Sequence, residues 1–120
     1  MDERIRIITY KGKDILLADC SYCTAAEVEG ISRLVPSYVT TQPKDSVLML
    51  ADFTGADINR DTVTEIKRDA VFNRPHVKRS AWVGTEAIPR VFFEHIKVFS
   101  QRDLPAFKTR EEAMEWLVSE

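Results

Sequence analysis

The segment that decides the fold is SVLMLADF, residues 46–53, a nearly uninterrupted apolar run with the length of one β-strand. A strand that is apolar at successive positions is typically covered on both faces, as in parallel sheets flanked by helices. The polar loop TGADINRD, residues 54–61, follows it directly. The segment therefore predicts a central strand of a layered α/β domain.

The residues before this segment predict two strands and a helix. Residues 4–10 alternate apolar and polar side chains, residues 11–13 form a short turn, and residues 14–19 form a second strand. This arrangement is typical of a β-hairpin. A helical pattern then runs over residues 28–39 with Pro36 inside it, where we expect a kink or a restart.

The residues after the central strand continue the alternation. Apolar positions in residues 63–71 mark a helix, and residues 77–84 predict another core strand. Residues 88–99 have helical spacing, with Pro89 as a first-turn proline. His95 falls on the apolar face of this helix, so we expect it to be a hydrogen-bonded core residue.

The chain is expected to finish with a short edge strand and a last helix. Residues 105–107 predict the strand, and residues 109–112 form a capping box, a threonine followed three residues later by glutamate. The buried face of the helix would carry Ala113, Trp116 and Leu117. The order β-β-α-β-α-β-α-(β)-α predicts an α/β domain with a four- to five-stranded mixed sheet and about four helices.

Composition limits the classes of function. The 120 residues suit one domain, and 44% hydrophobic with 30% charged residues is typical of a globular protein. The formal net charge of −2 gives no overall attraction to nucleic acid. No apolar run has the length of a transmembrane segment, and the first ten residues mix acids with bases unlike a signal peptide. We expect a single cytoplasmic domain over residues 1–120, with two reduced cysteines.

Those cysteines, Cys20 and Cys23, form a Cys-x-x-Cys pair between a predicted strand and a predicted helix. A helix dipole at this position could lower a thiol pKa, so a thioredoxin-like dithiol redox protein is the alternative function. The intervening Ser-Tyr lacks the Gly or Pro common in redox motifs, and both cysteines could simply be small buried hydrophobes. Only two histidines remain to complete a zinc site, and no glycine-rich phosphate loop is present, so we expect neither a metal nor a cofactor.

Five segments together resemble the SpoIIAA-like (STAS-type) domain family in their order and spacing, over about residues 11–118. They are KGKDILLADCS (11–21), SVLMLADFTGADI (46–58), NRPHVKRSAWVG (73–84), VFSQRDLPAF (98–107) and EEAMEWL (111–117). The resemblance implies a four- or five-stranded mixed sheet with helices against it. It also implies a regulatory or ligand-binding role with no catalytic centre, since related domains antagonise anti-sigma factors or sit on anion transporters.

Phospho-switched members of this family carry a serine in an Asp-Ser-Ser-Gly motif where the helix after the third strand begins. The matching region here, ADINRDTV at residues 56–63, has no serine. The nearest hydroxyls, Thr54 and Thr62, are the candidate phosphoacceptors.

We place the binding surface at the carboxyl ends of the strands at 46–53 and 77–84, where ligands of parallel α/β sheets bind. The residues chosen there are Asp52, Thr54, Gly55, Asn59, Gly84 and Thr85. The expected function is non-catalytic binding of a partner protein or of a small anionic or amphipathic ligand. A homodimer would form through an exposed sheet edge or the apolar residues 91–93. Asp52→Ala combined with Asn59→Ala is then expected to abolish partner capture and leave thermal stability nearly intact.

Overall fold

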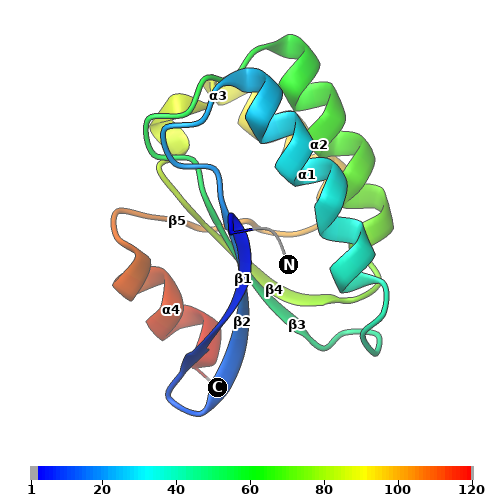
Figure 1. The fold of residues 1–120 in the computed structure, drawn as a ribbon, viewed down its shortest axis with the longest axis vertical. Coiled ribbons are helices and arrows are strands. Elements are labelled where there is room, and N and C mark those ends of the chain that lie inside the picture. Colours follow the sequence, from blue (N-terminus) through cyan, green and yellow to red (C-terminus); the bar gives the residue numbers. More distant parts are fainter. Residues whose placement is uncertain (1–2, 120) are drawn as a thin grey trace.

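The computed structural model describes residues 3–119 and contains one five-stranded sheet in the order β1-β2-β3-β4-β5 (Figure 1). The strands are β1 (Ile5–Tyr10), β2 (Lys13–Asp19), β3 (Val47–Asp52), β4 (Val77–Val83) and β5 (Ala106–Phe107). The helices are α1 (Ala25–Val39), α2 (Arg60–Asn73), α3 (Arg90–Ser100) and α4 (Arg110–Val118), with a 3₁₀ turn at Thr85–Ala87. Strand β1 is antiparallel to β2, and the other pairs are parallel. The predicted α/β class, mixed sheet and helices are confirmed.

Strand order explains which face each helix covers. The parallel strands follow one another across the sheet, and right-handed crossovers in one direction place α1, α2 and α3 on the same face. Helix α4 follows β5 and packs on the opposite face (Figure 1). Ala51 and Phe53 accordingly pack with the three-helix layer, while Leu50 packs with Leu117 of α4. The unbroken apolar run in β3 is thus explained by burial on both faces.

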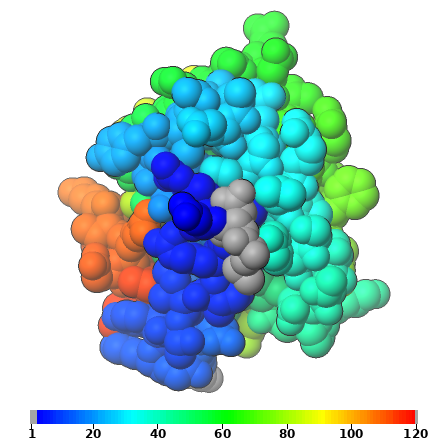
Figure 2. Space-filling model, viewed as in Figure 1, coloured from blue at the N-terminus to red at the C-terminus, as the bar shows by residue number. Residues whose placement is uncertain are grey.

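The β1–β2 hairpin closes through a tight turn whose two central residues have positive φ. Lys11 has φ 50° and Gly12 has φ 80°. This combination is typical of the type I′ turn, whose twist matches that of paired strands. Tyr10 then pairs with Lys13, and in the space-filling view the hairpin lies between α4 and α1 (Figure 2).

Polar side chains set the start of three helices. Thr24 and Glu27 form a reciprocal capping box at α1, and Asn59 and Thr62 form one at α2. At α4 the side chain of Thr109 accepts the backbone N–H of Glu112, which is one half of the predicted capping box. The Glu112 carboxylate accepts the hydroxyl of Thr109 in place of its backbone N–H. Each of the bonds from a backbone N–H satisfies a donor that the first helical turn leaves unpaired.

The restart expected at Pro36 does not occur, since α1 is one helix with buried residues on both sides of the proline. The expectation for His95 was wrong. His95 is exposed on α3, whereas Phe93 and Ile96 face the core. Apolar residues lie on both sides of α3, and contact between Phe93 and Trp82, with ring centroids 5.6 Å apart, selects the buried face. Pro89 precedes the helix as its N-cap.

Gly84 provides a test of the packing between neighbouring strand ends. It has φ 73°, and a Cβ there would lie 2.3 Å from the backbone nitrogen of Thr54. Gly84→Ala should lower the free energy of unfolding by about 3 kcal/mol or more, combining a left-handed backbone with a clash. Gly12→Ala is the matched control, because Gly12 also has positive φ but nothing within 4 Å. It should cost about 1 kcal/mol in the same urea titration, and equal losses would contradict the packing argument.

Candidate functional site

Strands β2 and β3 end in the same local motif, Ala-Asp-x-Ser or Ala-Asp-x-Thr. Asp19 pairs in register with Asp52, so the two carboxylates lie side by side on the face that α4 covers. Asp19 Oδ1 accepts the backbone N–H of Ser21 at 3.1 Å and its hydroxyl at 2.6 Å. Asp52 Oδ1 accepts the N–H and hydroxyl of Thr54 at 2.9 and 2.7 Å. Both aspartates therefore hold the turn that follows their own strand.

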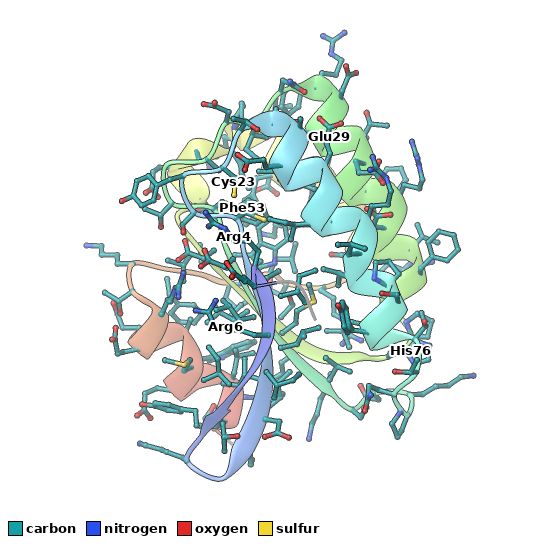
Figure 3. The ribbon with its side chains drawn as sticks, viewed as in Figure 1. Arg4, Arg6, Cys23, Glu29, Phe53 and His76 are labelled. Atoms are coloured by element: carbon teal, nitrogen blue, oxygen red, sulfur yellow. The ribbon has the colours of Figure 1, made fainter. Side chains whose placement is uncertain are left out.

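Arg110, the first residue of α4, bridges this aspartate pair. Its Nε donates to Asp52 Oδ2 at 2.7 Å, and its Nη2 lies 3.1 Å from Asp19 Oδ1. Arg6 of β1 and Arg4, which directly precedes β1, are labelled in Figure 3. Their guanidinium nitrogens lie 3.9 and 3.5 Å from carboxylate oxygens of Asp19. Burial acts to raise the pKa of Asp19, but hydrogen bonds from the following serine and the charge of Arg110 outweigh it and lower the pKa. The negative charges of Asp19 and Asp52 are thus balanced by arginine side chains of the protein itself.

The other residues of the predicted binding surface also make contacts that hold the fold together. Gly84 packs against the backbone of Thr54, and Gly55 lies beneath the ring of Tyr22. Thr85 begins the 3₁₀ turn, and Asn59 Oδ1 accepts the backbone N–H of Thr62, in the first turn of α2, at 2.9 Å. The structure thus brings Asp52, Thr54 and Gly84 together.

These contacts change the expectation for the double substitution at this edge. Asp52→Ala would leave Arg110 without its closest partner, and Asn59→Ala would remove a helix cap. The pair should therefore lower thermal stability rather than leave it intact. The strand order also never reverses, so no crevice of the kind found at a topological switch point is expected at this edge.

Both candidate phosphoacceptors, Thr54 and Thr62, use their hydroxyl groups in hydrogen bonds within the protein. Thr62 is fully buried, and its hydroxyl lies within hydrogen-bond distance of Glu29 and Asn59. Thr54 is half-buried and donates its hydroxyl to Asp52. Phosphorylation at Thr62 would require the α1–α2 contact to open first.

Cys20 and Cys23 are free and buried at the turn between β2 and α1, where the N–H of Cys23 donates to the carbonyl of Cys20 at 3.2 Å. Burial raises the pKa of both thiols. A dithiol enzyme needs a thiolate, which requires the opposite shift. This geometry gives the redox alternative no support.

A cavity of about 80 Å³ lies between the sheet and the layer formed by α1, α2 and α3. Its walls are mainly apolar and come from all three helices and the central strands. They include Ala18, Cys20, Val28, Ile31, Val35, Met49, Ala51, Phe53, Ile66, Trp82 and Ile96. Such a space depends on how side chains from distant segments fill one layer, so sequence patterns carry no signal for it.

The polar lining of this cavity centres on α2. Asp69 and Asn73 lie one helical turn apart, and Asp69 Oδ2 accepts the hydroxyl of Ser32 at 2.8 Å. Asn73 Oδ1 is buried, and within residues 3–119 it has no hydrogen-bond partner. A buried carbonyl oxygen without a partner is unusual in folded proteins.

Asp69 forms a coupled carboxyl pair with Glu65. Burial raises the pKa of Asp69 to about 6, and hydrogen bonding to Glu65 adds to the rise, against the effect of the bond from Ser32. For Glu65, burial acts to raise the pKa, but Arg33, with Nη2 2.8 Å from Oε1, lowers it overall together with other partners. Arg68 lies 3.8 Å from the same oxygen. The pair thus holds its proton on Asp69 as the pH falls below 6.

Comparison of the chain with family models, with curated proteins and with solved structures found no significant match. Between residues 3 and 119, none of the helices combines the length and hydropathy that a membrane crossing requires. Within that range, no three His, Cys, Asp or Glu side chains gather closely enough to hold a metal ion.

Arg110→Gln tests the bridge between the two aspartates. Because it leaves the buried carboxylate of Asp52 without its cation, we expect a loss of about 2–3 kcal/mol in the free energy of unfolding. Adding Asp52→Asn should recover at least half of the loss, because the amide keeps an oxygen for Thr54 and removes the unpaired charge. Urea titration of the three variants measures this coupling.

Lys108→Gln is the charge-matched control, because Lys108 is exposed two residues before Arg110. It should change stability by less than about 0.5 kcal/mol. Additive effects of Arg110→Gln and Asp52→Asn would contradict the bridge.

Asp69→Asn tests the raised pKa. The pKa of Asp69 is about 6 in the folded protein, whereas an ordinary aspartate has a pKa of about 4. Between these two pH values Asp69 keeps its proton in the native state and loses it on unfolding. The free energy of unfolding therefore falls as the pH rises from about 4 to about 6. Asparagine imitates the protonated carboxyl, and the variant should exceed wild type by about 1–2 kcal/mol at pH 7.5. The difference should shrink toward zero by pH 4 in urea titrations.

The control for this pH series is Asp57→Asn, which removes an exposed carboxylate from the loop before α2. It should follow the wild-type dependence on pH. A gain for Asp69→Asn that is equal at pH 4 and pH 7.5 would show that the raised pKa is not its cause.

Proposed function

We propose that this protein is a non-catalytic binding module that takes up a small apolar or amphipathic molecule between its sheet and its three-helix layer. The observation that carries the proposal is the cavity of about 80 Å³ with mainly apolar walls, to which Ser32, Asp69 and Asn73 add polar groups. Ligand pockets typically combine mostly apolar walls with a few polar groups that fix orientation.

The apolar walls of this space support occupation. Where the cavity opens toward solvent, these walls are not covered by other side chains of the protein. A ligand with an apolar body would remove them from contact with water, which is favourable. Because it would bind the folded state only, it would also shift the folding equilibrium.

Binding without chemistry is favoured by the way the polar lining is used. Ser32 donates to Asp69, Ser100 donates to the carbonyl of Lys97, and Ser80 accepts the indole N–H of Trp82. Only the hydroxyl of Ser32 is bound to a carboxylate, and that carboxylate is shared with Glu65, so none of the three hydroxyls belongs to a nucleophile–histidine arrangement. The buried thiols are held in their protonated form.

The resemblance to the SpoIIAA-like domains gives the proposal a biological role. An antiparallel first strand, parallel strands in chain order and three helices on one face agree with the fold that the resemblance implies. As a member of that family, the protein would act as a regulatory module. A ligand in the cavity would then alter the surface that a partner protein contacts. A partner surface at the carboxyl edge of the sheet stays a prediction.

Ala70→Leu tests the cavity directly. Ala70 lies on α2 and lines the space, so a leucine there should fill most of it. Xenon enters dry apolar cavities, and its ¹²⁹Xe resonance should shift saturably with wild-type protein but not with the variant. The free energy of unfolding of the variant should stay within about 1 kcal/mol of wild type or rise, because filling a void offsets any local strain.

Ala26→Leu is the matched control on the exposed face of α1. It should retain the full xenon response. An equal response in wild type and in a folded Ala70→Leu variant would place xenon elsewhere and remove the basis of the proposal.

A further inference from the structure

Strand β1 directs part of its backbone hydrogen-bonding groups away from the sheet. The N–H of Asp19 donates to the carbonyl of Arg4 at 2.7 Å, and the pairing with β2 continues to the hairpin turn without a shift of register. In an antiparallel ladder, every second residue bonds to the neighbouring strand. Bonding to β2 therefore falls on the even-numbered residues. The residues between them, Ile5, Ile7 and Thr9, present their N–H and C=O groups at the edge.

The two edges of the sheet differ in how they are protected from further pairing. Strand β5 has two residues, follows Pro105 and precedes the exposed Lys108. Short length, proline and lysine all hinder pairing at an edge. Strand β1 has six residues without proline, glycine or bulge. Its charged residue, Arg6, donates to the carbonyl of Glu3 at 3.0 Å, so the guanidinium is bound within its own chain. Strand β1 is thus the edge that a further strand can join.

Ile7 gives this edge an apolar contact. Within residues 3–119 it is the only large apolar side chain on a strand that is exposed, at 49%. It lies opposite Leu16, on the face that α1 covers, and lines a groove there with Tyr38 and Val47. A strand paired beside β1 would cover Ile7 with a cross-strand neighbour.

The sequence of β1 is complementary to itself in one antiparallel register. When a two-fold axis passes at Ile7, this residue lies opposite the same residue of a second copy, and Ile5 lies opposite Thr9. All three outward residues of each strand are then hydrogen-bonded. Arg6 lies opposite Ile8, which has no charge. No like charges face each other across the strands.

The neighbouring registers are less favourable. With the axis at Arg6, two guanidinium groups would lie directly opposite each other, which is destabilising. With the axis at Ile8, Ile5 would lie opposite Lys11, which has φ 50° in the hairpin turn and is not extended. The side chains and the turn therefore select the register centred on Ile7.

We propose that this protein forms a symmetric dimer in which β1 of one copy pairs antiparallel with β1 of the other, centred on Ile7, so that the two five-stranded sheets join edge to edge. Of the two surfaces expected for a homodimer, this is the sheet edge. The inference goes beyond the proposed function and does not depend on it, because β1 contributes no residue to the lining of the cavity.

Sedimentation equilibrium tests the dimer. The mass of wild type should rise from 13.8 kDa toward twice this value as the concentration increases from about 1 to about 300 µM. Ile7→Lys should remain at the monomer mass, because it places like charges directly opposite each other at the axis. Thr9→Lys is the matched control, since it adds the same charge at an exposed position of β1 that lies opposite Ile5 of the other copy. It should keep the dimer, and circular dichroism should show both variants folded.

Disulfide cross-linking tests the register by a separate route. Directly opposed residues of an antiparallel pair have Cα atoms about 5.5 Å apart, which a disulfide can span. Ile7→Cys should therefore form a covalent dimer in oxidised glutathione. Thr9→Cys should not, because its two copies would lie about 14 Å apart along the strands. Cys20 and Cys23 are buried and are common to both variants.

The outcomes decide the inference whether or not Ile7→Lys folds. Wild type that stays at the monomer mass throughout would overturn it and leave the edge to a strand of a different protein. A dimer that persists in folded Ile7→Lys, or equal cross-linking of Ile7→Cys and Thr9→Cys, would show another surface or register and would overturn it as well. The cavity is tested separately by its xenon response.

Discussion

The bridge from Arg110 to Asp19 and Asp52 is the interaction on which the rest of the structure depends. It joins the carboxyl ends of the two central strands to the first turn of α4, with nitrogen–oxygen distances of 3.1 and 2.7 Å. Helix α4 thereby covers the second face of the sheet, so that β3 is buried on both sides. Since each aspartate also holds its own turn, one cation organises the whole carboxyl edge. Removing a partner from such a buried pair costs more than the pair itself contributes, because a charge is left unsolvated.

This constraint decides where a ligand can bind. The carboxyl edge, which serves many parallel α/β sheets, is occupied here by ion pairs and by close packing of Gly84 against Thr54. Because the parallel strands follow in chain order, their three connecting helices form one layer on one face. The space left inside this layer has mainly apolar walls. Binding is therefore proposed within the helix–sheet layer, and the edge is assigned a structural role.

Local chemistry made most of the architecture predictable from sequence. Residues close together in the sequence were enough to predict the strand within 46–53, the hairpin before it and the helix cap at Thr109. His95 could not be placed, because α3 has apolar residues on both sides and only contact with Trp82 selects its buried face. The Arg110 bridge spans 58 residues to Asp52, although the repeated Ala-Asp-x-Ser/Thr motif was a signal that two carboxylates would meet and need a cation. The cavity has no sequence signal, since it is a property of packing.

The most direct test is a crystal structure of the protein under xenon pressure, because xenon enters apolar cavities. Electron density for xenon is expected between the sheet and α1, α2 and α3, with the contacts of Arg110 with Asp19 and Asp52 unchanged. Xenon bound only at the carboxyl edge around Gly55 and Thr85, or an empty cavity at saturating pressure, would contradict binding within the helix–sheet layer.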